Sequence, residues 1–261
     1  MSLTKAKHSI PEDKVNKKVL LTINSFGPLL KIDDLPKLSA DSKDLFIAHL
    51  VRSLEFFFNR PFATLKEEDL TRYTEVTTED AHIVFAPAYP NIVERIVKPL
   101  VTAKRHYSLG DYVSCIAVSG IICEMLTLLV WKMSTIRIHG QDITPEGEEK
   151  LFGKNFEKSE QKRRIDILLT IKAITDEQYK KFDNIRDTRN KYMHAWEYDT
   201  KQQKGDARRL MITTLLLFKE VTDMKLIVDK TGDQKVTINP RLHEFLQKSN
   251  TSKNTTLRSA K

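Results

Sequence analysis

The sequence predicts a mainly α-helical protein built around a helical bundle, and three observations lead to this prediction. Apolar residues recur at spacings of three and four along much of the chain, as they do on the buried face of a helix. Glycine and proline number 8 and 9 among 261 residues and mostly fall between the apolar stretches. Hydrophobic residues make up 40% of the chain, which is enough for a sizeable core. We therefore expect helices to dominate over sheets.

Residues 1–87 are expected to form an α-rich N-terminal extension. Prolines break the chain up to about residue 40, and the apolar run "VLLTINSFGPLL" within it fits either a helix or a strand. A helix over about 41–59 is clearer, because Asp41 or Ser42 can cap it and Pro61 stops it. The segment that follows, through "EVTTEDAHIVFAPAYP", is predicted to be a connector with one extended stretch at 82–85.

Residues 88–223 are expected to form the bundle itself. "NIVERIVKPLVTAKRHYSLG" predicts a helix that Pro99 kinks and Gly110 ends. "DYVSCIAVSGIICEMLTLLVWKM" is apolar nearly all round, with Glu124 in its middle, and predicts the buried central helix rather than a membrane span. A polar linker, "STIRIHGQDITPEGEEKLFGKN", holds at most one short turn of helix. Three further helices are predicted in "FEKSEQKRRIDILLTIKAI", "TDEQYKKFDNIRDTRNKYMHAWEY" and "KGDARRLMITTLLLFKEVTDM".

The C-terminal part is expected to add a small hairpin and helix over residues 224–248. "KLIVDKTGDQKVTI" has two short β-favouring runs around Thr-Gly-Asp, which is typical of a hairpin. "PRLHEFLQ" predicts a short terminal helix. Residues 249–261 are polar, basic and poor in apolar residues, so we expect a disordered tail.

Charge and cysteine content bound the function only loosely. The net charge of +8 and the pI near 9.3 are compatible with a polyanionic partner, and equally with none. Cys115 and Cys123 lie two turns apart on one helix, roughly 12 Å along its axis, which is too far for a disulfide. The starting string "MSLTKAKHSIPEDK" lacks the apolar core of a secretory signal. We expect a cytoplasmic protein with reduced cysteines and no membrane association.

The string "RDTRNKYMHAW" departs from an ordinary amphipathic helix. Phe182, Ile185, Tyr192 and Trp196 form an apolar seam at helical spacing, and the position that should continue this seam is Arg189. A guanidinium group in an apolar seam requires either a buried partner or a function.

Asn190 and His194 lie four residues apart and therefore on one face, with Arg186 one turn before Asn190. Arg189 and His194 diverge by roughly 140° around the helix, which a long arginine can bridge by curling back. Arginine stabilises charge on a pentavalent phosphorus, histidine moves a proton near neutral pH, and asparagine orients either partner. RNA supplies its own nucleophile, the 2′-hydroxyl. This chemistry needs no metal and no cofactor.

Two features of the sequence bear on the alternatives. The seven histidines never pair at metal-ligand spacing, and there is no phosphate-cradling glycine loop and no nucleophile elbow. A purely structural interpretation is also open, in which Arg189 pairs with a buried Glu124 and His194 bonds to a carbonyl in the core.

The string "RNKYMH", residues 189–194, resembles the R-x4-H signature of the HEPN superfamily (higher eukaryotes and prokaryotes nucleotide-binding domains). "GDYVSCIAVSGIICEML" is similar to the second helix of that family, with a small residue at Gly120 and an acidic one at Glu124. "RRIDILLTIKAITDEQYKKFDNIRDTRNKYMH" is similar to its usual approach to the motif. The resemblance covers roughly residues 90–223.

The resemblance implies an α-helical bundle that usually dimerises, with the motif helices of two protomers facing across a cleft. Many members are metal-independent endoribonucleases of toxin–antitoxin, abortive-infection or other antiviral defence systems, held in check by a partner protein, and some are inactive binding modules. By carry-over, Arg189 would stabilise the transition state, His194 would act as acid or base, and Asn190 would position the phosphate. One histidine per chain suits a homodimer, which supplies the second.

In one branch of the family a modified tyrosine follows two positions after the histidine, where this chain has Trp196, with Tyr198 beyond it. Control by that route is therefore not expected. Cations near the motif or at the start of the preceding helix could guide RNA by its phosphates, or could simply be solvated. These candidate RNA-binding residues are Arg186, Lys191, Lys158, Lys162, Arg163 and Arg164.

Overall fold

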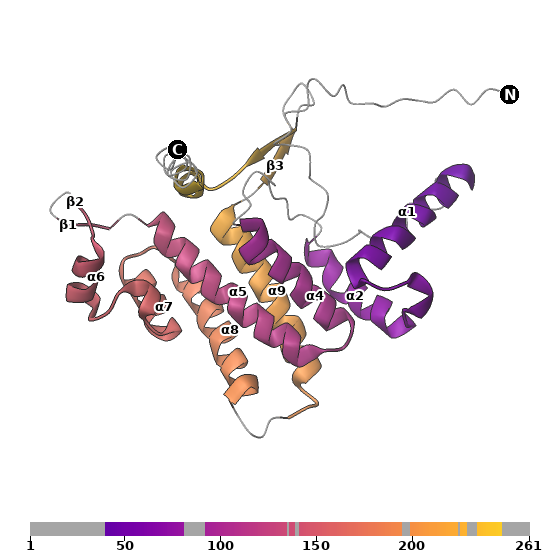
Figure 1. The fold of residues 1–261 in the computed structure, drawn as a ribbon, viewed down its shortest axis with the longest axis horizontal. Coiled ribbons are helices and arrows are strands. Elements are labelled where there is room, and N and C mark those ends of the chain that lie inside the picture. The colour runs from indigo at the N-terminus through magenta and orange to yellow at the C-terminus, as the bar shows by residue number, and fades with distance from the viewer. Residues whose placement is uncertain are drawn as a thin grey trace, which may run out of the picture.

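The computed structural model describes residues 40–80, 92–134, 136–138, 141–194, 199–223, 225–228 and 234–246. Most of these residues are helical, so the predicted mainly α fold class is confirmed (Figure 1). The helical elements are α1 (Ala40–Phe58), η2 (Phe62–Thr64), α2 (Glu67–Asp80), η3 (Val93–Val97), α4 (Lys98–Ser108), α5 (Tyr112–Met133), α6 (Pro145–Phe152), η4 (Phe156–Lys158), α7 (Gln161–Thr170), α8 (Asp176–His194) and α9 (Gln203–Thr222). Residues 240–246 are helical too.

The helix α5 runs through the middle of the bundle and contacts α4, α7, α8 and α9 (Figure 1). It begins at the expected place, because Asp111 caps it by accepting a hydrogen bond from the Ser114 backbone N–H at 3.2 Å. By length and composition α5 could also cross a membrane, but 56% of its apolar window is buried inside the protein. This packing agrees with the predicted bundle helix.

Both cysteines of α5 are buried free thiols. Burial is the main reason that the pKa of Cys115 rises to about 12, and it raises the pKa of Cys123 as well. A thiol with a raised pKa is a poor nucleophile, so both behave as core residues, as the sequence predicts.

The kink predicted at Pro99 takes the form of a wider helical turn. Residues Val93–Val97 form the π-helical turn η3, and α4 follows it directly from Lys98. Proline has no backbone N–H and its ring clashes with the carbonyl one turn earlier, so the regular hydrogen-bond ladder cannot pass through it. The helix continues beyond Pro99 and packs on α5, α2 and α9.

The prediction of a connector after α1 is wrong for residues 67–80, which form α2. Its threonines have low helix propensity, so propensity alone does not predict the helix. Tertiary packing provides the stability instead, since Tyr73 and Val76 are fully buried and α2 contacts α4 and α9. The stretch predicted as extended, 82–85, lies outside the described residues.

The predicted helix at about 41–59 is present as α1, and its C-terminal half packs in a small second core. Leu54, Phe57 and Phe58 of α1 join Tyr73 of α2 in this core. The fully buried Lys104 of α4 places its ammonium group 4.4 Å from the centre of the Tyr73 ring, a cation–π contact. The N-terminal helices are thereby attached to the bundle.

The polar linker after α5 contains more structure than predicted. Arg137–Ile138 (β1) pairs antiparallel with Gln141–Asp142 (β2), and α6 follows, a helix of two turns. Thr144 caps α6 and Gly153 ends it at a φ of +72°, where glycine is favoured.

Near the C-terminus, Lys225–Val228 (β3) pairs antiparallel with Gln234–Thr237 (β4), from Lys225 opposite Thr237 to Val228 opposite Gln234. Residues 229–233, where the predicted hairpin turn falls, lie outside the described residues. The same is true of the predictions for residues 1–39 and for the tail from 247 onward.

Candidate functional site

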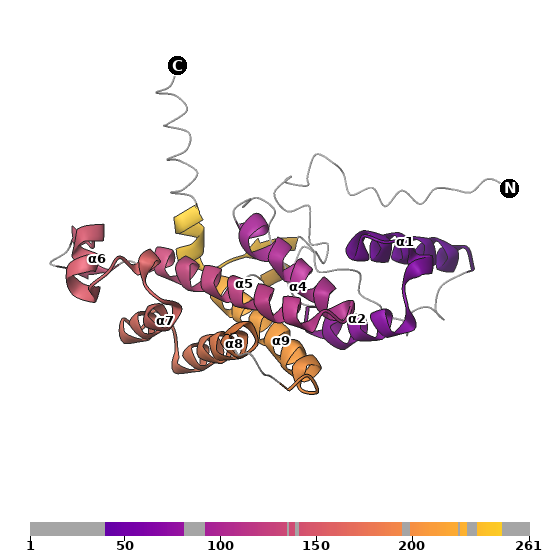
Figure 2. The same ribbon diagram turned by 60° about the horizontal axis from the view of Figure 1, so that its bottom comes forward.

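The helix α8 carries the R-x4-H string, and its start and its buried face fix the orientation of that string. Thr175 and Gln178 form a reciprocal capping box, in which each side chain accepts from the other residue's backbone N–H, at 3.2 and 3.0 Å. The helix then lies between α7, α5 and α9 (Figures 1 and 2). The orientation of the motif is therefore set by ordinary helix packing.

The buried seam of α8 differs from the predicted one at a single position. Phe182, Ile185 and Tyr192 are buried as expected, but Thr188 continues the seam where Arg189 was predicted. A period of 3.6 allows either residue, and the small threonine fits between packed helices. Arg189 lies about 100° further round at the edge of the interface, with 28% of its side chain exposed. Trp196 lies outside the described residues.

Arg189 is held against α5 by shape and by charge. Its aliphatic stem lies on Gly120, so closely that a Cβ at position 120 would come within 2.6 Å of Arg189 Cγ. Its Nη1 lies 3.6 Å from Glu124 Oε1, one helical turn further along α5. Glycine at position 120 thus creates the space that the arginine occupies, and Glu124 attracts its guanidinium group.

The ion pair between Arg189 and Glu124 that the structural interpretation predicts is present, but it is not buried. Both side chains are nearly one third exposed, and 3.6 Å is longer than a good hydrogen bond. Arg189 Nη1 also donates to Asn190 Oδ1 at 3.4 Å, which is a weak contact. A guanidinium group with loose contacts and partial exposure can accept a new anionic partner at little cost.

His194 is the last residue of α8 and is exposed to solvent, whereas Asn190, one turn earlier, is half-buried. In the described part of the chain, Arg189 contacts Gly120, Glu124 and Asn190 but not His194. The two motif residues therefore do not meet within one protomer. Each nevertheless reaches the surface, where a ligand or a second protein chain could bring them together.

A buried carboxylate that the sequence analysis missed, Asp206, fixes the last turn of α8. It lies in the first turn of α9 and is only 7% exposed. It accepts hydrogen bonds from Tyr192 Oη at 2.7 Å, Lys191 Nζ at 3.3 Å and Arg209 Nη2 at 2.5 Å. The signal available in the sequence was an acidic residue in the first turn of the next helix.

The environment of Asp206 favours its charged form. Burial alone would raise its pKa, but hydrogen bonds from Tyr192 and Lys191 and the charge of Arg209 outweigh burial and lower the pKa. Burial and the same carboxylate raise the pKa of Tyr192, which stays protonated as the donor. Asp206 is thus a charged anchor that holds α8 at Tyr192, two residues before His194.

Two of the predicted RNA-binding cations on α8 are already engaged with carboxylates. Arg186 pairs with Asp183 at 3.0 Å and with Asp187, and its Nε is buried without a hydrogen-bond partner in the described structure. Lys191 is exposed and shares Asp206 with Tyr192. An incoming phosphate would compete with these contacts.

The predicted cluster before and within α7 lies beside the first half of α8. Lys162 Nζ donates to Tyr179 Oη at 2.5 Å and pairs with Asp183 at 3.2 Å, and these two contacts raise its pKa. Arg163 donates to the Phe152 carbonyl and Arg164 to the Glu157 carbonyl. Lys158 is exposed at the end of η4. From Asp183 to His194 is roughly 16 Å along the axis of α8, so the cluster is well separated from the motif.

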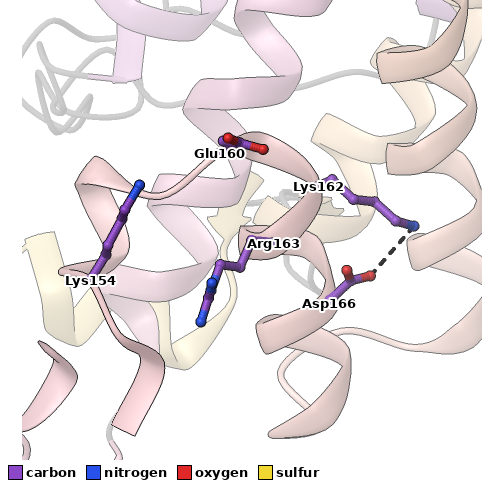
Figure 3. Close-up of a pocket in the computed structure, with 5 residues that line it drawn as sticks. All are labelled: Lys154, Glu160, Lys162, Arg163 and Asp166. Carbon is purple, nitrogen blue, oxygen red and sulfur yellow. Dashed lines mark ion pairs between the residues drawn. The ribbon is translucent and has the colours of Figure 1, made fainter. Parts of the chain in front are cut away.

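A shallow pocket of about 290 Å³ opens within this cluster (Figure 3). Lys154, Lys162 and Arg163 line it together with the carboxylates of Glu160 and Asp166. Asp166 lies 3.4 Å from Lys162 Nζ and is 49% exposed. An anion entering the pocket would meet negative as well as positive charge.

Comparison of the chain with protein-family models, with curated proteins and with solved structures finds no match.

Within the described residues, no group of three or more His, Cys, Asp or Glu side chains is placed to hold a metal ion.

Proposed function

We propose that this protein is a metal-independent endoribonuclease of HEPN type that acts as a homodimer. The observation that carries the proposal is the exposure of His194 at the end of α8, on the helix that holds Arg189 beside Glu124. A histidine that served only the core would be enclosed. An exposed imidazole and a loosely paired arginine are instead available to a phosphodiester.

The proposed reaction is transesterification within the RNA strand. A base removes the proton of a 2′-hydroxyl group, the 2′-oxygen bonds to the adjacent phosphorus, and the bond from phosphorus to the 5′-oxygen breaks. An acid gives the 5′-oxygen its proton, and the products are a 2′,3′-cyclic phosphate end and a 5′-hydroxyl end. Arg189 stabilises the extra negative charge and Asn190 positions the phosphate. In a dimer, His194 of each protomer takes one of the two proton-transfer roles.

The surface of α5 supports a second copy as the partner. Ile121 is 49% exposed, and Met125 and Leu128 on the same face are only partly buried. This apolar strip adjoins Glu124, which pairs with Arg189. Burying the strip against its symmetry mate would bring two copies of α8 near one another, as the HEPN resemblance implies. A defence setting, with a partner protein that restrains the nuclease, is part of the same proposal.

The proposal predicts cleavage of RNA in excess EDTA and no cleavage of the same sequence made with 2′-deoxynucleotides. The reason is that the nucleophile belongs to the substrate and no metal-bound water is used. Denaturing electrophoresis measures cleavage, and acid treatment of the fragments followed by mass spectrometry identifies the cyclic phosphate. Cleavage of the deoxy strand, or an RNA strand left intact over a panel of sequences, would contradict the proposal.

A rival function has support from one contact, the ion pair between Arg189 and Glu124. In that alternative the chain is a non-catalytic nucleotide-binding or protein-interaction module, and the pair holds the bundle together. The partial exposure of both side chains limits the energy that such a pair can contribute.

Arg189→Ala separates the two functions by its effect on stability. We expect a loss of about 1 kcal/mol in the free energy of unfolding, from the packing of the stem on Gly120 and a partly exposed ion pair. Denaturant unfolding measures this loss, with Lys180→Ala at an exposed position of α8 as the matched control. A loss of about 3 kcal/mol or more would support the structural rival, because removing one partner of a truly buried pair costs that much.

A further inference from the structure

The helix α8 ends and α9 begins at one end of the bundle (Figure 1). Several cations at this end are exposed. Contacts of Lys191 and Tyr192 with Asp206 tie the two helices together there. His194 is the last residue of α8 at this end. We call the group the α9 basic surface; it comprises Lys191, Lys201, Lys204, Arg208 and Arg209.

Carboxylates lie beneath this surface rather than on it. Asp206 binds Lys191 and Arg209 from below, and its side chain is 10% exposed. Glu75 of α2 accepts from Lys204 Nζ at 2.9 Å and is 29% exposed, while the Glu75 carbonyl accepts from Arg208. These anchors hold the cationic side chains in place, so less conformational entropy is lost when they bind a ligand. A polyanion approaching from solvent meets the cations first.

The backbone of α9 is also accessible at the centre of this surface. Gly205 is exposed, and a Cβ added there would meet nothing within 4 Å. Arg208 and Arg209 lie on the same face of the helix, three and four residues further on, and Lys201 lies just before α9. The N-terminal end of this 20-residue helix adds partial positive charge. A phosphate can therefore come close to the helix between the cationic side chains.

The predicted cations before and within α7, Lys158, Lys162, Arg163 and Arg164, form a second group, the α7 cluster, which has the opposite arrangement. Glu160 and Asp166 are exposed beside Lys162 and Arg163 in the same pocket (Figure 3). A phosphate there would be repelled by both carboxylates. Two exposed carboxylates adjoin the α9 basic surface without sharing its cations. Asp199 caps a turn by accepting from the Lys201 backbone N–H, and Asp187, one turn before Lys191 on α8, pairs with Arg186.

We propose that the α9 basic surface binds the phosphates of a single-stranded RNA and leads that strand to His194. The choice of RNA as the ligand rests on the proposed function, whereas the location of the surface rests on the charges and exposures above. The surface is continuous with the last turn of α8, because Lys191 belongs to both. In the described residues, the contacts of Lys162 with α8 fall instead on its first half, at Tyr179 and Asp183.

Three charge-matched variants test the location, each losing three positive charges. The first changes Lys201, Lys204 and Arg208 to Gln, and the second changes Lys154, Lys158 and Arg163 to Gln. The third changes exposed cations on other elements, Arg52 of α1, Lys66 just before α2 and Lys98 of α4, to Gln. Each is made in the His194→Ala background, so that a fluorescent RNA oligonucleotide stays intact during anisotropy titrations between 50 and 300 mM salt, a range of roughly two-fold in screening length.

We expect the first variant to weaken RNA binding at least ten-fold at low salt. The slope of log Kd against log salt should also fall by about 2, because each of the three lost phosphate contacts contributes roughly 0.7. The other two should change binding less than three-fold. Circular dichroism and thermal melting identify any variant that has unfolded. If the first variant is unfolded, Lys201→Gln with Arg209→Gln replaces it, because Arg209 is one of several donors to Asp206.

Equal losses of affinity in all three variants, a larger loss in the second, or binding by an acidic peptide but not by RNA would overturn the inference. The nuclease proposal is tested separately, by cleavage with the protein that retains His194. If that protein cuts no RNA while binding still depends on the first variant's residues, only the nuclease proposal fails. If it cuts RNA while the first variant binds normally, only the present inference fails.

Discussion

His194→Ala should reduce the rate of RNA cleavage by about 10²–10⁴-fold, which is the typical contribution of a positioned proton-transfer group. The loss should fall on the rate and not on the fold, because His194 is exposed at the end of α8 and its removal leaves no cavity. Single-turnover cleavage in EDTA measures the rate, and thermal melting and light scattering measure fold and mass. His243→Ala, at another exposed position in residues 240–246, is the matched control.

Mixing the variant with the unchanged protein tests whether two histidines are needed in one site. If each site uses His194 from both protomers, a mixed dimer has no complete site. Activity after subunit exchange should then fall with the square of the unchanged fraction, whereas independent protomers give a linear fall. Cleavage by His194→Ala at the unchanged rate would remove the enzyme proposal altogether.

Asp206→Ala should destabilise the protein by about 3 kcal/mol, more than a change at any exposed carboxylate. The carboxylate is buried, and its removal leaves the Tyr192 hydroxyl inside the protein without its acceptor. The affected contacts join α8 to α9 next to the motif, so hydrogen exchange should rise first in the last turn of α8. Denaturant unfolding measures the loss. Asp187→Ala, whose side chain is 63% exposed, should stay within about 0.5 kcal/mol of the unchanged protein.

Asp206→Asn isolates the contribution of the charge through its pH dependence. The pKa of Asp206 is lowered in the folded protein. Its charge therefore contributes stability that is fully present above the unfolded pKa, about 3.9, and is lost as the pH falls through the folded pKa. The difference in unfolding free energy between the unchanged protein and Asp206→Asn should be constant near neutral pH and shrink below about pH 4. A difference that persists unchanged at pH 3 would mean that shape, not charge, is the contribution.

Helices with a strong apolar pattern could be predicted from the sequence, because burial repeats along them with the helical period. The helix α5 is the clearest example, since its apolar run and its Asp111 cap are both local features. The helix α2 could not be predicted in this way. Its threonines disfavour a helix, and burial of Tyr73 and Val76 against distant parts of the chain offsets that preference.

The candidate site divides in the same way between local pattern and tertiary contact. The helix that carries Arg189, Asn190 and His194 follows from its spacing, and the pairing of Arg189 with Glu124 was one of two alternatives that the sequence left open. The exposure of that pair was not predictable, because it depends on Thr188 taking the buried position of the seam. Asp206 was missed because it lies on α9 and its partner Tyr192 lies on α8, and these two helices come into contact only in the folded chain.

The sequence alone determined the mainly α-helical class, the position of the central helix and the order of the chemically useful residues along α8, since each follows from local spacing and capping. Only the tertiary structure decided that the aliphatic stem of Arg189 lies on Gly120 and that the α7 cations share their pocket with exposed carboxylates. It also decided that Asp206, a carboxylate paired with cations of the α9 basic surface, is largely buried beneath them. The physical reason is that electrostatic interactions depend on distance and solvent exposure, and residues far apart in the chain acquire both only when the helices pack together.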